Sequence, residues 1–487
     1  MTSAETRMND TSYRPLVHFT PRAGWMNDPN GLVYFNDEWH LFHQYYNPAE
    51  IDGMQWGHAV SRDLMHWQHL PPAIPPDEHG HIWSGSAVVD HENSSGLFGG
   101  KPGMVCLFTY WDPEDQRQCQ GLAYSADGRQ FAIYEGNPVI PQLRHLDGHP
   151  DDKDFRDPKV FFHAETKRWI MAVAGGKLRI FSSTNLIDWT FEHCHEDIHT
   201  ECPDLFPLQV DGDPNRREWV LSGGGRWYSL GEFDGKRFIP TTVAIPFGAG
   251  PDFYATQTWS DAPDDRRVAI SWIFKWGYGA GAKDGAIANP FPTGPIAGGS
   301  MGIPTELSLV TTEAGVRLRQ QPVGELAALI AKASTRNAIA VKQGTAVPLT
   351  ELGVACCDVD LELSVPVGAT LILRLSTIGG QHVDLAVDNR EQALVIDRRA
   401  CVIEGTTGYS ERFTTPLPIG EDGRVALRVL FDRSVLEVFA DDGRTMMSAF
   451  VVPALPSAWQ ALAEGGECRI DTLSVRWLQN GGADDEY

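Results

Sequence analysis

A polar turn followed by an aromatic residue recurs through the first half of this chain. The element Ser61-x-Asp63-x-x-x-Trp67 returns with related residues at Ser125, Ser183 and Glu232. The steps between these positions are 64, 58 and 49 residues. Each occurrence fits a hairpin whose aromatic side chain packs against the next unit. A period of about 50 residues in a strand-rich region with many Gly and Trp residues is typical of β-propeller blades.

Five polar motifs keep a similar spacing. Their positions are separated by 56, 73, 44 and 51 residues and are marked by Asp28, Ser84, Asp157, Glu201 and Asp252. Five motifs at blade spacing suggest five blades, each of which brings one polar cluster to the central axis on its innermost strand. This arrangement explains how acids that lie 129 and 44 residues apart in the sequence converge in one funnel.

The character of the chain changes after the repeats end near residues 301–304. A last strand is expected over 306–310, and residues 325–330 predict a short helix. Farther on, alternating strands without Trp-rich turns are expected over 360–365, 370–375 and 425–430. Short strands with frequent turn signals are typical of a β-sandwich. We therefore expect an all-β protein with a propeller over 14–320, a linker over 321–336 and a sandwich over 337–480.

Three acidic motifs suggest what the first domain does. They are Trp25-Met26-Asn27-Asp28-Pro29-Asn30-Gly31, Phe155-Arg156-Asp157-Pro158 and Glu201-Cys202-Pro203-Asp204. Each motif alone could be a tight turn or a local ion pair. Hydrolysis of a glycosidic bond, however, needs two carboxyl groups, one to attack or stabilise and one to protonate the leaving group. The three motifs together therefore predict a glycoside hydrolase.

These motifs resemble those of glycoside hydrolase family 32, the β-fructofuranosidases, which include invertases, inulinases and levanases. Trp83-Ser84-Gly85-Ser86 and Asp252-Phe253-Tyr254-Ala255 are similar to two further motifs of the family, which usually has Phe in place of Trp83. Near the C-terminus, Asp432-Arg433-Ser434, Glu437-Val438-Phe439 and Asp442-Gly443 resemble the second domain of the family. The resemblance implies an N-terminal five-bladed β-propeller and a C-terminal β-sandwich.

The resemblance also implies a retaining, two-step reaction in which Asp28 forms a covalent fructosyl-enzyme and Glu201 acts as acid and base. An attacking carboxylate must be ionised, so we expect Asn27 and nearby backbone amides to hold the pKa of Asp28 low. Glu201 must be protonated when it meets the leaving oxygen. We therefore expect the pKa of Glu201 to lie above that of Asp28, in a less polar setting.

The third acid, Asp157, is implied by the resemblance to grip fructose hydroxyls and to stabilise the transition state. Arg156 beside it is expected to keep Asp157 ionised. Sugar binding further needs aromatic faces and amide or hydroxyl donors. By position in family-like stretches, the predicted substrate-binding residues are Asn27, Gln44, Trp56, Trp83, Ser84, Arg156, Tyr254 and Trp272.

Potential metal ligands crowd the segment 193–202, which contains His193, Cys194, His195, His199 and Cys202. Their spacing fits no standard zinc pattern, and Cys202 belongs to an acidic motif. The Gly pairs and triplets of the chain lack the Lys or the following helix of a nucleotide-binding loop. We therefore expect neither a metal nor a cofactor.

The net charge of −24 argues against nucleic acid, whose phosphates would be repelled, and against an anionic membrane surface. A neutral sugar is compatible with this charge. No window approaches the ~20 apolar residues of a membrane span, and residues 1–13 lack the apolar core of a secretion signal. Eight cysteines do not form a dense disulfide framework in 487 residues. We predict a cytoplasmic protein, and the sequence leaves a homo-oligomer open.

Several functional alternatives remain from the sequence alone. A fructosyltransferase shares the covalent intermediate, and an inverting glycosidase on a five-bladed propeller shares a three-acid arrangement. Residues 93–96, 118–125 and 136–140 resemble exo-acting fructan hydrolases more than sucrose-6-phosphate hydrolases. The sequence does not rank sucrose, inulin and levan as substrates, because that choice depends on the shapes of loops around the acceptor.

Overall fold

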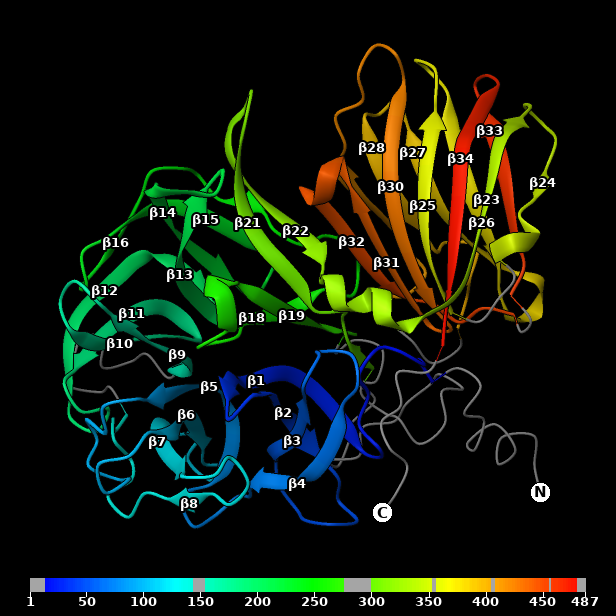
Figure 1. Ribbon diagram of the computed structural model, residues 1–487. Coiled ribbons are helices and arrows are strands. Elements are labelled where there is room, and N and C mark those ends of the chain that lie inside the picture. The colour runs from blue at the N-terminus through cyan, green and yellow to red at the C-terminus, as the bar shows by residue number, and fades with distance from the viewer. Residues whose placement is uncertain are drawn as a thin grey trace.

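The computed structural model describes residues 14–142, 154–275, 299–352, 356–403, 408–454 and 457–479. Within these ranges the protein consists almost entirely of β-strands, in two domains that lie side by side (Figure 1). The predicted all-β fold, with an N-terminal five-bladed propeller and a C-terminal sandwich, is confirmed. Residues 1–13, on which the prediction about a secretion signal depends, lie outside the described residues.

The propeller has five antiparallel, four-stranded blades around a central axis (Figure 1). In order, the blades are β1 (Trp25–Phe35), β2 (Glu38–Tyr46), β3 (Gln55–Ser61) and β4 (Gln68–Ile74); β5 (His81–Asp90), β6 (Gly103–Trp111), β7 (Gln118–Ser125) and β8 (Ala132–Ile133); β9 (Arg156–His163), β10 (Arg168–Ala174), β11 (Gly176–Ser183) and β12 (Trp189–Thr200); β13 (Pro203–Val210), β14 (Asp213–Gly223), β15 (Trp227–Phe233) and β16 (Phe238–Pro240); and β18 (Tyr254–Thr258), β19 (Val268–Ile273), β21 (Thr305–Thr312) and β22 (Gly315–Pro322). Two short strands, β17 (Ile245–Pro246) and β20 (Ser300–Met301), pair with β15 and β19. The first strands of neighbouring blades contact one another, so β1, β5, β9, β13 and β18 surround the axis.

The recurring polar turn connects the third and fourth strands of a blade. Asp63 Oδ1 accepts hydrogen bonds from the backbone N–H groups of Met65 and His66, at 3.0 and 2.8 Å. Asp127, Asn185 and Asp234 accept equivalent pairs of backbone hydrogen bonds. A side-chain oxygen thus satisfies the donors that the reversing chain leaves free, which is why Asp or Asn recurs at this position.

The aromatic residue after each turn packs against the preceding blade, not against the next unit as expected. Trp67 of blade 1 stacks on Trp259, which follows β18 of blade 5, with ring centroids 6.3 Å apart. Phe131 of blade 2 meets Phe42 of blade 1 edge-on at 5.5 Å. The turn leads into the outermost strand of its blade, so the aromatic side chain is carried on that strand or just before it.

The C-terminal domain is a sandwich of two six-stranded antiparallel sheets. One sheet contains, in spatial order, β23 (Ile330–Val341), β34 (Cys468–Leu478), β25 (Cys356–Ser364), β30 (Arg424–Asp432), β31 (Val435–Ala440) and β32 (Thr445–Phe450). The other contains β24 (Val347–Pro348), β33 (Trp459–Glu464), β26 (Thr370–Ser376), β27 (His382–Asp388), β28 (Ala393–Asp397) and β29 (Arg412–Pro416). Alternate residues at the start of β30 are buried, as the sequence predicted for a strand with one face in a core.

The connection between the domains is shorter than the predicted linker, 321–336. A 3₁₀ helix, η3 (Gly324–Leu329), occupies its first half, where a short helix was expected. The second half already belongs to β23, because residues from Ile330 onwards pair with β34. Four further 3₁₀ helices of three residues each complete the helical part of the described residues, namely η2 (Pro263–Asp265), η4 (Thr350–Leu352), η5 (Ile378–Gly380) and η6 (Asp441–Gly443).

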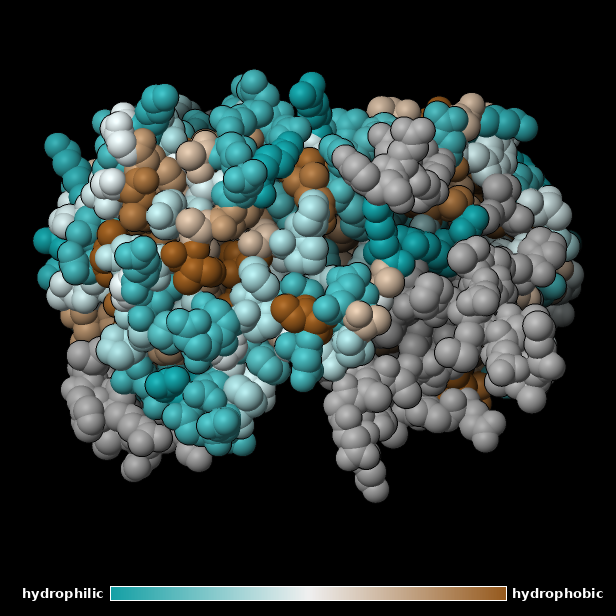
Figure 2. Space-filling view, turned by 90° about the horizontal axis from the view of Figure 1, so that it is seen from below, coloured by the Kyte–Doolittle hydropathy of each residue, from teal (hydrophilic) through white to brown (hydrophobic). Residues whose placement is uncertain are grey.

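The two domains share one continuous apolar core. Trp25 and Trp272 of the propeller belong to the same buried cluster as Leu436 and Phe450 of the sandwich. Figure 2 shows the molecule from below. Hydrophilic residues predominate on this face, and the apolar residues exposed there gather on the propeller half. Among the described residues, no helix is long and apolar enough to span a bilayer.

Candidate active site

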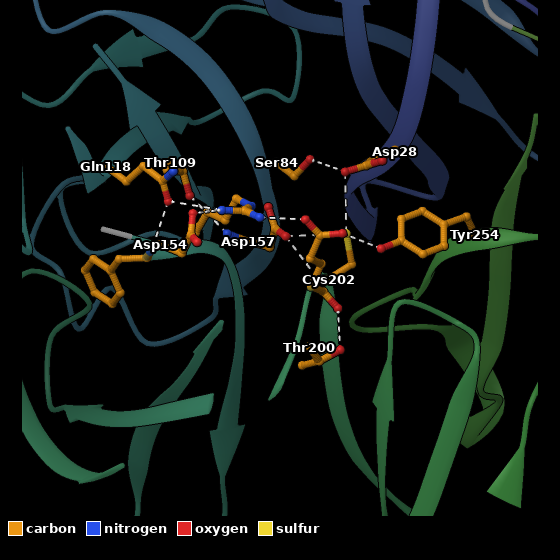
Figure 3. Close-up of polar contacts among 12 residues, drawn as sticks. Asp28, Ser84, Thr109, Gln118, Asp154, Asp157, Thr200, Cys202 and Tyr254 are labelled. Atoms are coloured by element: carbon orange, nitrogen blue, oxygen red, sulfur yellow. Dashed lines mark hydrogen bonds and ion pairs between the residues drawn. The ribbon is translucent and has the colours of Figure 1, made fainter. Parts of the chain in front are cut away.

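Asp28 lies in β1 among hydrogen-bond donors from three different motifs (Figure 3). Ser84 Oγ, from the innermost strand of blade 2, donates to Asp28 Oδ2 at 2.7 Å. Asn27 Nδ2 donates to Asp28 Oδ1 at 3.2 Å, and the indole N–H of Trp25 donates to Asn27 Oδ1 at 2.8 Å. Both oxygens of the Asp28 carboxyl group are therefore held in place, and the amide that holds one of them is itself oriented.

Asp157 and Cys202 form the centre of the cluster. The backbone N–H of Cys202 donates to Asp157 Oδ2 at 2.9 Å, and the backbone N–H of Asp157 donates to Thr109 Oγ1 at 3.0 Å. Both residues adopt the left-handed region, with φ of +63° at Asp157 and +42° at Cys202. Such conformations cost about 1–3 kcal/mol each and persist where surrounding contacts enforce them. The backbone is thus strained at two of the residues that the motifs single out.

The Cys202 thiol links the first two acids. Its Sγ lies 3.4 Å from Asp28 Oδ2 and 3.5 Å from Asp157 Oδ2. Burial raises the pKa of this thiol well above its usual value, and the nearby carboxylates raise it further. Cys202 is therefore a neutral thiol, a weak donor between two carboxyl groups.

Glu201 lies in the turn between β12 and β13 and is more accessible than the other two acids, with 44% of its side chain exposed. Arg156 Nη2 donates to Glu201 Oε1 at 2.5 Å, and the hydroxyl of Tyr254 donates to Glu201 Oε2. Arg156 Nη1 also donates to Asp154 Oδ1 at 2.6 Å. Arg156, Glu201 and Tyr254 line a cavity of about 410 Å³ that opens to solvent.

In this structure the pKa values of Asp28 and Glu201 shift in the directions opposite to those predicted. Burial raises the pKa of Asp28, although Ser84 and Asn27 stabilise its ionised form. Burial also opposes ionisation of Glu201, but the hydrogen bonds from Tyr254 and Arg156 outweigh it, and the pKa of Glu201 lies below its usual value. The predicted directions are wrong because the donors of Arg156 and Tyr254 reach Glu201, while at Asp28 the loss of solvent outweighs the hydrogen bonds from Ser84 and Asn27.

The pKa of Asp157 is raised to about 7. Burial is the main cause, the positive charge of Arg156 acts against it, and the neighbouring charge of Asp28 adds to it. The expectation that Arg156 keeps Asp157 ionised is therefore only partly met, because Arg156 directs its hydrogen bonds to Glu201 and Asp154 instead.

The predicted aromatic residues differ in their access to the site. Trp83 is partly exposed and stacks on Trp111, with ring centroids 4.9 Å apart and an interplanar angle of 12°. Trp56 and Trp272 are 0% exposed, so neither can offer its face to a sugar, and this part of the prediction is wrong. Trp56 instead donates its indole N–H to the carbonyl of Trp83 at 3.0 Å, and Trp272 packs edge-on against Trp25 at 5.8 Å. Trp56 therefore supports Trp83, and Trp272 supports Trp25, which orients Asn27.

Gln44 is also largely enclosed, at 2% exposure, and its Nε2 donates to the carbonyl of Ile82 at 3.2 Å. Asp252, expected to deliver its polar group to the axis, instead lies against the sandwich, where its carboxylate accepts hydrogen bonds from Arg398 and the N–H of Phe450. Tyr254, two residues farther on, is the member of this motif that reaches the site.

Sequence reasoning missed Trp111, Thr109 and the thiol of Cys202 as parts of the site. Trp111 lies at the end of β6, and Thr109 two residues before it, opposite Trp83 in the strand pairing. The signal available for these two residues was their position on the strand next to a recognised motif. Cys202 lay inside a motif, but its neighbours in sequence gave no sign that the thiol would meet Asp28 from another blade.

Within the described part of the chain, Asp28, Asp157 and Cys202 place potential metal-ligand atoms within 4.8 Å of one another. Ligation requires a thiolate, and burial raises the pKa of the Cys202 thiol far above its usual value. Without a metal ion the Cys202 thiol is therefore neutral and lies as a weak donor between the two carboxyl groups. In the segment 193–202, His195 Nε2 instead accepts a hydrogen bond from the backbone N–H of Phe238 at 3.3 Å.

Profiles of two known protein domains match almost the whole chain. "Glycosyl hydrolases family 32 N-terminal domain" covers residues 18–322, and "Glycosyl hydrolases family 32 C terminal" covers residues 325–476. The chain belongs to glycoside hydrolase family 32. The family inferred from the acidic motifs is thereby confirmed, and with it the class of enzyme.

Relatives in family 32 match over most of this chain. The levanase of Bacillus subtilis (strain 168) is 37% identical, over 98% of this chain and 72% of the levanase. The levanase of Bacillus sp. (strain L7) is also 37% identical, but this chain spans only 53% of its length. The extracellular exo-inulinase of Aspergillus awamori is 32% identical, over 94% of this chain and 93% of that enzyme.

Solved structures of family 32 show the same architecture. The exo-inulinase from Aspergillus awamori superimposes with a TM-score of 0.83 at 29% identity, over 97% of this chain and 99% of that one. A fructofuranosidase from Schwanniomyces occidentalis in complex with fructosylnystose gives a TM-score of 0.81 at 26% identity, again over 97% and 99%.

Proposed function

We propose that this protein is a retaining β-fructofuranosidase, which removes terminal β-D-fructofuranosyl residues from fructans such as inulin or levan, or from sucrose. The observation that carries the proposal is the convergence of Asp28, Asp157 and Glu201 on one cluster. Cys202 contacts both Asp28 and Asp157, and Glu201 is its neighbour in the chain. The names of the relatives, levanase and exo-inulinase, support fructans as the substrate class.

In the proposed first step, an oxygen of Asp28 attacks the anomeric carbon of the terminal fructosyl unit, and Glu201 gives its proton to the departing oxygen. The carbon–oxygen bond of the glycoside breaks as the Asp28 ester forms. In the second step Glu201 removes a proton from water, which attacks the same carbon and releases fructose and the Asp28 carboxylate. The buried Asp157 accepts hydrogen bonds from fructose hydroxyls.

The first step needs a protonated Glu201, while Arg156 and Tyr254 favour the ionised form in the substrate-free arrangement. We propose that the leaving sugar, bound in the cavity that Glu201 lines, excludes water from this carboxyl group and moves Arg156 aside. Both changes raise the pKa of Glu201. Arg156 is free to exchange partners, because it already divides its donors between Glu201 and Asp154.

The configuration of a transfer product tests this mechanism. When sucrose is hydrolysed in the presence of methanol, a retaining enzyme yields methyl β-D-fructofuranoside, which does not mutarotate and is identified by NMR. Methyl α-D-fructofuranoside would contradict the proposal and support the inverting alternative. The ratio of free fructose to free glucose from sucrose alone distinguishes hydrolysis from fructosyl transfer, because a transferase releases much less fructose than glucose.

The remaining predictions about partners and location also stand as proposals. The net charge of −24 supports the absence of nucleic acid and of an anionic membrane surface as partners. A homo-oligomer stays open and is tested by light scattering. The cytoplasmic location stays a prediction, and cell fractionation tests it. The test is needed because the relative from Aspergillus awamori is named extracellular.

A further inference from the structure

A segment of the propeller just before β18 is bound to the sandwich through its backbone. The N–H of Ala249 donates to the carbonyl of Met446 at 2.9 Å, and the N–H of Ser448 donates to the carbonyl of Ala249 at 3.2 Å. Ser448 Oγ donates to the carbonyl of Asp252 at 2.6 Å. Residues 249–252 therefore lie along β32 like an added strand. A shift of β32 would therefore shift residues 249–252 with it.

Arg398 of the sandwich reinforces this contact from inside the protein. Its Nη1 donates to Asp252 Oδ2 and to the carbonyl of Phe450, both at 2.9 Å. The guanidinium carbon lies 4.1 Å from the ring centroid of Tyr409 and 5.2 Å from that of Phe413. The side chains of Arg398 and Asp252 are both fully buried. Such an ion pair is sensitive to loss of one partner, which leaves an uncompensated charge in the interior.

The bound segment leads directly into the active site. Tyr254 follows Asp252 by two residues, and its hydroxyl donates to Glu201 Oε2. In Figure 3 the ring of Tyr254 points from the edge of β18 towards the acid cluster. Arg226 Nη1 donates to the carbonyls of Gly250 and Phe253, at 3.1 and 2.9 Å. The segment between the sandwich and the site is therefore also fixed by the propeller.

We propose that Arg398 is a positioning residue of the active site, which acts through Asp252 to hold the segment that carries Tyr254 and so the hydrogen bond between Tyr254 and Glu201. The sandwich is then part of the catalytic apparatus, and not solely a support, although none of the sandwich residues that the structure describes forms a hydrogen bond or ion pair with the three acids. This inference rests on the proposed role of Glu201 as acid and base.

Replacing Arg398 should therefore affect the reaction through Glu201. Arg398→Gln leaves Asp252 without its cation, and the segment relaxes. Misplacement of catalytic groups by about 1 Å can cost up to about 100-fold in rate, so we expect a loss of about 10- to 100-fold in kcat with little change in KM. The limb of the pH profile of kcat/KM that reports protonated Glu201 should move to higher pH, as it should in Tyr254→Phe. Arg398→Lys, which keeps the charge, should recover part of the rate.

A double-mutant cycle separates positioning from simple stabilisation. If Arg398 acts through Tyr254, the double variant Arg398→Gln with Tyr254→Phe should be hardly slower than the slower of the two single variants. The matched control is His18→Gln, which removes an equally buried contact between the two domains. His18→Gln should lower the melting temperature but keep kcat and the pH profile. Losses that multiply in the cycle, or a pH profile of Arg398→Gln like that of the wild type, would overturn the inference.

A second measurement does not depend on turnover. A carbodiimide couples an amine to a protonated carboxyl group, and peptide mass spectrometry follows modification of Glu201 across pH. Glu201 should be modified at higher pH in Arg398→Gln than in the wild type or in His18→Gln. A folded Arg398→Gln protein with wild-type modification refutes the positioning role. A wild-type protein that releases no sugar from sucrose, inulin or levan would refute the proposed function, while this labelling still decides the inference.

Discussion

His18 is placed to make the stability of this protein depend on alkaline pH. It precedes the first blade, and its Nδ1 and Nε2 lie 2.9 Å from Asp432 Oδ2 and 2.9 Å from Glu437 Oε2, in the sandwich. All three side chains are essentially buried, with at most 1% exposed. Both ring nitrogens face carboxylate acceptors, so the doubly protonated ring alone can donate to both.

The magnitude follows from the shift in the pKa of His18. Burial opposes the charged ring, but the hydrogen bonds to Asp432 and Glu437 and their charges outweigh it and raise the pKa from 6.5 to about 9. A difference of about 2.5 pKa units corresponds to about 3 kcal/mol of unfolding free energy. Because the pKa is higher in the folded state, this contribution is fully present below pH 6.5. It is lost as the pH rises towards 9.

The test compares urea denaturation of the wild type and His18→Gln at several pH values from 6 to 9, followed by tryptophan fluorescence. At pH 6 the variant should be less stable by about 3–5 kcal/mol, since two carboxylates lose their buried partner. This difference should shrink by about 3 kcal/mol at pH 9. His66→Gln, which removes an exposed histidine from a contact with Asp63 at 2.7 Å, is the control and should leave the pH dependence unchanged. A stability difference between wild type and His18→Gln that stays constant from pH 6 to pH 9 would refute the reasoning.

Four further outcomes are expected. Dialysis against a strong chelator should leave activity on sucrose unchanged, because two carboxyl groups need no Lewis acid, and a loss restored by zinc would contradict this. Asp28→Ala should lose nearly all turnover on every substrate. Glu201→Ala should retain more of its rate on a fructoside with an activated aryl leaving group than on sucrose, and equal losses on both would argue against an acid role. Burial lowers the pKa of His43 from 6.5 to about 4. Because the unfolded chain binds this proton more readily, lowering the pH from 6.5 to 4 should reduce the unfolding free energy by about 3 kcal/mol. The melting temperature of His43→Gln should therefore depend less on acid pH than that of the wild type.

Local chemistry made much of the fold predictable. The Asp63 and Asp127 turns are encoded within three residues, because a side-chain oxygen and the following backbone N–H groups meet without help from the rest of the protein. The direction in which Trp67 packs was not local, since its partner Trp259 lies in the last blade of the ring. The start of β23 was also missed, because those residues are strand only by virtue of pairing with β34, far along the chain.

In the site, the motifs located the acids but not their surroundings. Asp28 and Glu201 were found because their chemistry is concentrated in short stretches of sequence. Trp272 was expected at the surface of the site, and its 0% exposure depends on packing between β19 and neighbouring elements that no motif records. The proton affinity of Glu201 was misjudged for a similar reason, since the decisive donor, Tyr254, comes from a different blade.

The exposure of the acids indicates their roles better than their pKa values in the substrate-free structure do. Asp28 is fixed through both oxygens by Asn27 and Ser84, which suits an attacking group that must be immobile and aligned. Glu201 has 44% of its side chain exposed and lines the open cavity. A group that gives a proton to a leaving alcohol and then takes one from water must be open to the leaving sugar in the first step and to water in the second. Arg156 is one of the two partners that lower the pKa of Glu201, so its proposed displacement by the leaving sugar would let the substrate itself raise this pKa.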